Sequence, residues 1–166
     1  MIIKIDRNGN VTNETVDEKE IYNNNLFNKE MVVFLLNDEN QVLLQKRSSN
    51  KKFYPNMWSL CTGHIEKMES PIYAAKREMK EELGINIKLK NIIPFAIFDE
   101  SNIHKIYFFY TRCNLKINEF VIQKEELSEV MWFDIDKVID MIKNHSKQIV
   151  HKENRINLFK KLKDIY

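Results

Sequence analysis

The chain has 166 residues, of which 43% are hydrophobic and 30% are charged. These proportions are typical of globular proteins and exclude disordered, collagen-like and fibrous chains, and the length fits one domain. Lys and Arg total 26 against 24 Asp and Glu, so the net charge is only +2, which argues against a nucleic-acid polymer or an anionic membrane surface as the partner.

The cysteines and the apolar runs indicate where the protein works. Cys61 and Cys113 form no CxxC pair, and two cysteines do not make a disulfide framework. The first ten residues lack the apolar core of a signal peptide, and no apolar run approaches the roughly 18 residues that span a membrane. We therefore expect a cytoplasmic protein in a reducing compartment.

Apolar and β-branched runs between turn signals predict strands. They are residues 1–5, 31–36, 41–45, 85–98 (interrupted near Pro94), 104–113 and 130–133. Asn8-Gly9 marks a hairpin turn. The polar, weakly patterned residues 11–29 are expected to form loop and edge structure, and residues 46–57, which contain Pro55, a loop.

Residues 70–83 have the clearest helical pattern in the chain. Ser70 is a candidate N-cap and Pro71 occupies the first helical position. One apolar stripe at helical spacing contains Ile72, Ala75, Met79 and Leu83. Gly84 follows the last turn and is expected to end the helix.

Two further helical segments are expected at 134–144 and 151–164, the second with a solvated basic face. Strands and helices mix without a regular βαβ alternation, which favours an α/β sandwich around a mixed β-sheet over a Rossmann fold. We expect one domain over 1–166, with an N-terminal strand and loop extension at 1–29 and a C-terminal helix at 146–166.

Three carboxylates share one face of the helix at 70–83. Glu78, Glu81 and Glu82 are spaced i, i+3, i+4, and like charges so placed repel one another. One explanation is a solvated face in which Arg77 and Lys80 dilute the charge. The other is a hard divalent cation, Mg²⁺ or Mn²⁺, which carboxylate oxygens suit.

The residues around this helix complete a known motif. Gly63 is followed by five residues and Glu69, then by seven residues and the run REMKEELGI from Arg77 to Ile85. The pattern G-x5-E-x7-R-E-U-x-E-E-x-G-U resembles the Nudix box of the Nudix hydrolase superfamily at every defined position. A weaker similarity extends from about residue 31 to residue 135. This part is also similar to the branch that contains isopentenyl-diphosphate isomerase.

The resemblance implies a fold and structural roles. The fold would be the Nudix α/β/α sandwich, with the box as a loop–helix–loop. Gly63 would let the chain turn into the box and Gly84 would end the helix. Glu69 and Arg77 would form a charge pair that fixes the loop to the helix.

The resemblance also implies a chemistry. Glu78, Glu81 and Glu82 would be metal ligands for Mg²⁺ (or Mn²⁺), with Glu78 and Glu82 also catalytic. The reaction would be hydrolysis of a diphosphate bond in a small molecule, a nucleoside diphosphate linked to another moiety X. Many relatives form dimers, so a homodimer is possible.

Many members of the family use a further carboxylate outside the box, as a general base or an additional ligand. We favour Glu126 for this catalytic role over its neighbour Glu125, and over Asp99 and Glu100. The alternative for Glu126 is an exposed loop acid.

Substrate contacts are expected from residues near the box. Arg47 and Lys52, together with Lys51, could attract phosphate oxygens, although a solvated lysine loop gives the same pattern. Trp58, like Phe53 and Tyr54, could stack on a base or pack in the core. His64 could contact a phosphate or bond to the backbone.

Two alternatives to hydrolysis stay open. An isomerase-like enzyme would need a cysteine directly before Gly-His, whereas Thr62 separates Cys61 from Gly63. It would also need acids on a later strand, and residues 102–109 (NIHKIYFF) contain none. A non-catalytic binding module is disfavoured because no box glutamate is missing. Thr62 and Met68 stand where relatives often have glycine.

Overall fold

The computed structural model of the chain describes residues 2–25, 29–99 and 104–165. Its strands are β1 (Ile2–Ile5), β2 (Val11–Val16), β3 (Glu30–Leu36), β4 (Gln41–Arg47), β5 (Trp58–Ser59), β6 (Cys61–His64), β7 (Ile93–Asp99), β8 (Lys105–Arg112) and β9 (Leu127–Asp134). Within these residues they form one sheet in the order β2-β1-β7-β8-β3-β4-β5, while β6 pairs with β3 and β9 with β4. The β1–β7 and β3–β8 pairs are parallel and the other pairs antiparallel.

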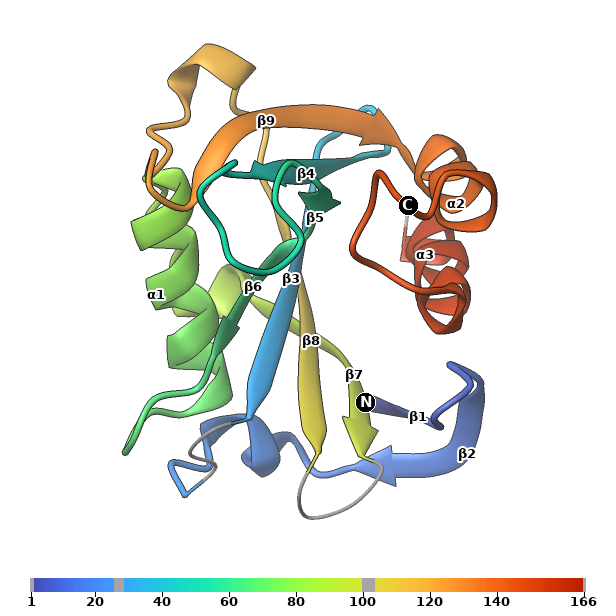
Figure 1. Cartoon of the computed structure of the whole chain (residues 1–166). Coiled ribbons are helices and arrows are strands. Elements are labelled where there is room, and N and C mark those ends of the chain that lie inside the picture. Colours follow the sequence, from blue (N-terminus) through green and yellow to red (C-terminus); the bar gives the residue numbers. More distant parts are fainter. Residues whose placement is uncertain (1, 26–28, 100–103, 166) are drawn as a thin grey trace.

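Helices cover both faces of this sheet (Figure 1). Helix α1 (Pro71–Leu83) lies on one face, and α2 (Ile135–Asn144) and α3 (Ile156–Leu162) lie on the other. The expected α/β sandwich around a mixed sheet is therefore confirmed. None of the helices in the described residues is long and apolar enough to cross a membrane.

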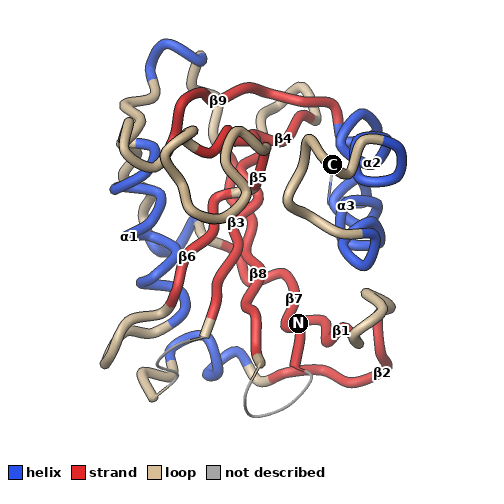
Figure 2. The backbone as a smooth tube through the Cα atoms, viewed as in Figure 1, coloured by secondary structure: helices blue, strands red, loops and turns tan. Residues whose placement is uncertain are grey.

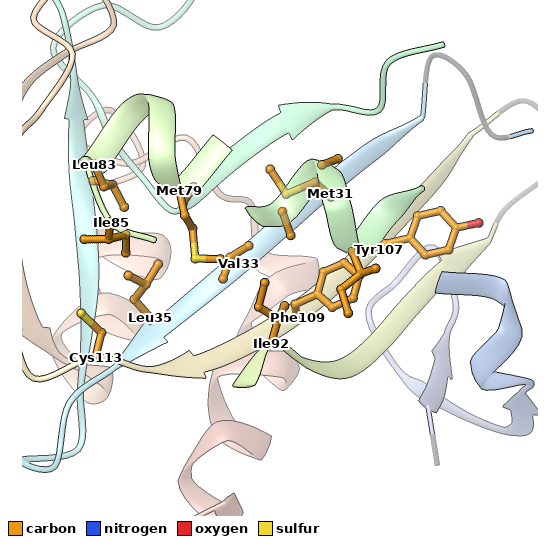
Figure 3. Packing of buried hydrophobic residues seen from close by; sticks show 14 of the residues in the cluster. Met31, Val33, Leu35, Met79, Leu83, Ile85, Ile92, Tyr107, Phe109 and Cys113 are labelled. Carbon is orange, nitrogen blue, oxygen red and sulfur yellow. The ribbon is translucent and has the colours of Figure 1, made fainter. Parts of the chain in front are cut away.

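Strand β3 is buried on both faces, which explains its unbroken apolar sequence. Its residues Met31, Val33 and Leu35 belong to the core beneath α1, where Met79 and Leu83 pack (Figure 3). The alternate residues Val32, Phe34 and Leu36 belong to the second core, beneath α2 and α3. The strand therefore joins the two cores and fixes the height of α1 above the sheet.

Helix α1 begins and ends where the sequence predicts. Ser70 is the N-cap, but its hydroxyl makes no cap bond and is buried with no hydrogen-bond partner among the residues that the structure describes. Gly84 ends the helix in the left-handed conformation, with φ of 71°, and its N–H donates to the carbonyls of Lys80 and Met79. A side chain at Gly84 would also collide with Val121.

The expected strand over 85–98 is wrong in its first half. Ile85 is buried, and Ile87 and Leu89 pack against the core beneath α1, yet no ladder forms before Ile93. Alternating apolar residues here cover the core as an irregular segment that ends in a 3₁₀ turn at Leu89–Asn91. Pro94 lies inside β7, where a bulge between Pro94 and Ala96 interrupts the pairing.

Other boundaries also differ from the sequence-based expectation. Strand β4 runs on to Arg47, β9 is longer than 130–133, and the segment 11–29 contains the edge strand β2 and a 3₁₀ helix at Glu18–Tyr22. The short strands β5 and β6 were not expected. The helix expected at 151–164 is regular only within α3, with 3₁₀ turns on both sides.

The C-terminal segment is part of the fold rather than an appendage. The stretch between α2 and α3, drawn as loop in Figure 2, lies beside β5. There the N–H of Trp58 donates to the carbonyl of Gln148 at 2.8 Å, and the N–H of Val150 donates to the carbonyl of Trp58 at 2.9 Å. Phe159 of α3 is fully buried, and its ring meets Phe34 edge-on at 5.3 Å between centroids.

Phe159→Ala should therefore destabilise the whole protein. Removing a fully buried phenyl ring leaves a cavity and costs about 3–5 kcal/mol of unfolding free energy. Lys160→Ala, one residue away and exposed, should change it by less than about 0.5 kcal/mol. Urea unfolding followed by circular dichroism measures both, and equal small effects would show that α3 is not part of the core.

Candidate functional site

A cleft of about 1030 Å³ opens between α1, the strands β3, β4 and β6, and the segment that precedes α3. Its lining includes Glu78, Glu81 and Glu82 from α1 and Gly63 and His64 from β6. Gly63 and the three predicted helix carboxylates thus meet at one wall of this cleft.

Gly63 lies directly under a carboxylate. It pairs with Met31 in the antiparallel β3–β6 ladder. A Cβ atom added to Gly63 would lie 2.2 Å from Oε1 of Glu78. The absence of a side chain at Gly63 therefore leaves room for the Glu78 carboxylate against this strand. Gly63 does not provide the turn that we expected.

Arg77 connects the segment before α1 to the glutamates. Its Nε and Nη2 donate to the two oxygens of Glu69, each at 2.9 Å, which is a bidentate ion pair. Nη2 also donates to the carbonyl of His64 at 3.0 Å. Nη1 donates to Glu78 at 2.7 Å and to Glu81 at 3.2 Å. These bonds raise the pKa of Arg77, so it stays charged.

Glu82 is the most buried of the three helix carboxylates, with 8% exposure. Burial raises its pKa to about 7, and the negative charges of Glu78 and Glu126 add to the rise. Gln45 of β4 donates from Nε2 to Oε2 of Glu82 at 2.6 Å, which partly offsets it. Burial also raises the pKa of Glu78. The side chain of Glu81, by contrast, is 53% exposed.

Of the candidate carboxylates outside the box, the structure brings Glu126 to the cleft. Its side chain forms an ion pair with Lys51. Glu125 is exposed and does not line the cleft, and Asp99 pairs with Lys105 at 3.2 Å, also away from the cleft. Glu100 lies outside the described residues.

The predicted substrate contacts divide into two groups. Arg47, Lys51 and His64 line the cleft, and Arg47 is held by a bond from Nε to the carbonyl of Phe53 at 3.1 Å. Lys52 and Trp58 do not line it. Trp58 packs edge-on against Phe133 at 5.0 Å between ring centroids, and Lys52 lies over the exposed ring of Phe53.

The carboxylate oxygens are suitable ligands for a hard cation, but their present positions do not form a metal site. No three His, Cys, Asp or Glu side chains of the described residues converge closely enough to hold a metal ion as they stand. Arg77 draws Glu78 and Glu81 to one nitrogen, while Gln45 draws Glu82 towards β4. Oxygen donors match the preference of Mg²⁺ and Mn²⁺, and a cation would offset the repulsion that raises the pKa of Glu82. The donor set therefore fits such an ion after rotation of these side chains.

Sequence reasoning missed several residues of the cleft. Gln45, Gln123, His151 and Arg155 all contact Glu82 or line the cleft. The run of Gln45, Lys46 and Arg47 at a strand end was a usable signal for Gln45. No local pattern marks His151 or Arg155, because they reach the cleft only through the packing of the C-terminal segment.

The raised pKa of Glu82 predicts how stability depends on pH. The folded state binds this proton up to about pH 7, whereas the unfolded chain releases it near 4.5. Stability is therefore lost as pH rises between these values. Between about pH 5 and pH 8, the unfolding free energy of Glu82→Gln should therefore fall by about 2.5 kcal/mol less than that of the wild type.

Urea unfolding in the presence of a chelator measures this effect. Glu125→Gln, which changes an exposed acid outside the cleft, is the matched control and should follow the wild type at both pH values. If the stability of Glu82→Gln changes with pH as that of the wild type does, the pKa of the Glu82 carboxyl is not raised in the folded state.

Comparisons with known proteins identify the family and the fold of this chain. A profile of the NUDIX domain matches residues 27–152. The uncharacterized Nudix hydrolase lin0387 of Listeria innocua is 34% identical over 108 residues, which cover 64% of this chain and 63% of that protein. A prenyl-diphosphate phosphatase of Methanosarcina mazei is 26% identical over 125 residues, 75% of this chain and 74% of that protein.

An isopentenyl-diphosphate Delta-isomerase of Photorhabdus laumondii is 25% identical over 150 residues, 87% of this chain and 82% of that protein. The crystal structure of DR0079 from Deinococcus radiodurans has a TM-score of 0.65 at 16% identity and covers 97% of this chain and 98% of that one, so the fold is shared. The match to the Listeria protein spans less than two thirds of that protein's length. The domain match alone covers more than half of this chain, which therefore belongs to the NUDIX domain family.

Proposed function

We propose that the protein is a metal-dependent hydrolase that cleaves a diphosphate bond in a nucleoside diphosphate linked to a moiety X. The observation that supports this most is the pair of carboxylates in one cleft, the buried Glu82 and the half-buried Glu78, both with raised pKa values. Buried acids whose pKa values are raised cost stability, and such groups cluster at functional sites. Members of the family generally use divalent metal ions such as Mg²⁺.

Glu78, Glu82 and the more exposed Glu81 are the residues that would hold the ion, Mg²⁺ or Mn²⁺. When bound, it neutralises charge on the diphosphate and lowers the pKa of the attacking water. Arg77 bonds to Glu78 and Glu81, and Gln45 bonds to Glu82, so these side chains would rotate away from those partners to hold the ion. Glu69, Gly63 and Gly84 act as scaffold.

Glu126 is the proposed general base. It lines the same cleft as the glutamates of α1, and its negative charge contributes to the raised pKa of Glu82. The ion pair with Lys51 fixes the orientation of this carboxylate. Arg47, Lys51 and His64 are placed to contact phosphate oxygens of the substrate.

The isomerase-like alternative is disfavoured by the position of Cys61. The thiol is buried with 2% exposure, belongs to the core beneath α1 and does not line the cleft. Burial raises its pKa well above the ordinary value, and the charges of Glu82 and Glu78 raise it further. Such a thiol is a poor proton donor to a substrate that it does not reach. Strand β8 also has no carboxylate.

The wider setting of the activity is also a proposal. The relatives' names include a phosphatase of prenyl diphosphates, so the substrates to be tested include a prenyl-type diphosphate beside the nucleotides, and X is left to experiment. We propose one domain over the whole chain, since α3 contributes to the core. A cytoplasmic location and a homodimer stay predictions.

Product analysis tests the reaction. Purified protein with Mg²⁺ is offered nucleoside di- and triphosphates, nucleotide sugars, dinucleoside polyphosphates and isopentenyl diphosphate. We expect release of a monophosphate, phosphate or pyrophosphate that stops when a chelator is added. Glu82→Gln should lower turnover by about 100- to 10,000-fold while the fold is retained. Dimethylallyl diphosphate without phosphate release would establish the isomerase instead.

The neighbours Glu125 and Glu126 provide a matched test of the general base. Glu126→Gln should lower kcat by about 100-fold or more, because it removes the proton acceptor. Glu125→Gln should leave kcat unchanged, since that side chain is exposed and does not line the cleft. Equal effects of the two changes on steady-state kinetics would exclude Glu126 as the base.

A further inference from the structure

The C-terminal segment contributes a partly buried guanidinium to the lining of the cleft. Arg155, in the 3₁₀ turn before α3, lines the cleft. Its Cζ lies 5.0 Å from the ring centroid of Phe108 and 5.6 Å from that of Phe98. Its Nη1 is buried and has no hydrogen-bond partner in the part of the chain that the structure describes.

The two rings hold the guanidinium without using its hydrogen-bond donors. Aromatic faces attract a guanidinium through its flat surface, while its N–H groups point outwards in the plane. A buried N–H without an acceptor is rare in proteins and calls for one. Burial also lowers the pKa of Arg155, and the charge of Glu30 opposes this effect. The site therefore holds a cation that is short of negative partners.

His151 adds a neutral donor to the same part of the lining. Its Nε2 accepts the N–H of Leu60 at 2.9 Å, so the ring proton of the neutral form is on Nδ1. Burial lowers the pKa of His151 to about 3, and the charge of Arg155 lowers it further, so the ring stays neutral. His151, Lys152 and Asn154 line the cleft beside Arg155, and Glu30 and His104 face them from β3 and the residue before β8.

The strand register shows where Arg155 lies relative to the box. Thr62 of β6 is opposite Val32 of β3, and Val32 is opposite Phe108 of β8. Neighbouring strands are about 4.8 Å apart, so Phe108 lies roughly 10 Å from β6. Arg155 therefore lies over the second strand from β6, away from the wall that carries the glutamates, where the group attached to the diphosphate can reach it.

We propose that Arg155, with His151 beside it, forms an oxyanion subsite that binds a phosphate or carboxylate group carried by X. This inference rests on the proposed function, because it describes the part of the substrate beyond the scissile diphosphate. It predicts a substrate that carries a second anionic group in X, beyond the scissile diphosphate. A prenyl diphosphate, whose X is apolar, would leave Arg155 without a partner.

Binding can be tested without metal or turnover. The side-chain Nε–H signals of arginine in ¹⁵N NMR spectra are followed in chelator while inorganic phosphate, or separately acetate, is added. The signal that is missing in Arg155→Gln should shift saturably, and that of the exposed Arg7 should not. Saturation by phosphate alone identifies a phosphate subsite, and saturation by both a general oxyanion subsite. A shift for acetate alone identifies a carboxylate subsite. If Arg155 does not shift, or shifts no more than Arg7, the subsite does not exist.

Kinetics test the consequence for substrate choice. Arg155→Gln should raise KM by about 10- to 100-fold for substrates with an anionic X, with kcat and substrates lacking that anion unchanged. Arg155→Lys, which keeps the charge and serves if Arg155→Gln does not fold, should raise KM less, and Arg7→Gln should have no effect. A wild type that hydrolyses no diphosphate contradicts the proposed function, while the NMR result still decides on the subsite. Equal losses for both substrate classes would overturn the subsite alone.

Discussion

The guanidinium of Arg77 ties the segment before α1 to the helix that carries the glutamates, and the geometry of the cleft depends on this link. One side of the guanidinium is occupied by Glu69, which fixes the loop, and the other side by Glu78 and Glu81. The carbonyl of His64 joins β6 to the same group. Without this charge, the carboxylates of Glu78 and Glu81 would repel one another on the same helix face.

The same arrangement of carboxylates lowers the stability of the folded protein. Glu82 and Glu78 are partly or fully removed from water, and their raised pKa values record the cost of keeping them ionised. Stability therefore comes from elsewhere, chiefly from β3, which is buried on both faces and joins the two cores. The C-terminal segment contributes to both stability and the site, since Phe159 packs in the core beneath α2 and α3 and Arg155 lines the cleft.

The sequence predicts what is local and little of what is long-range. The spacing of apolar residues, Pro71 and Gly84 were enough to place α1, and the box placed its glutamates on one face. Met68, where relatives often have glycine, adopts a left-handed φ of 64°, which explains the preference for glycine. The segment 85–92 was wrongly predicted as a strand, because an alternation of apolar residues indicates that one side is buried and does not require pairing with another strand. Gln45 and Arg155 reach the cleft across 37 and more residues of chain, a distance that no local pattern encodes.

The central claim is that Glu78 and Glu82 hold a divalent ion in the cleft. A crystal structure of the protein grown with Mn²⁺, with anomalous diffraction recorded to locate the manganese, tests this claim most directly. The account predicts an anomalous peak within bonding distance of oxygens of both Glu78 and Glu82, with Arg77 still paired to Glu69. A protein that binds no manganese in the cleft, or binds it away from both glutamates, would contradict it.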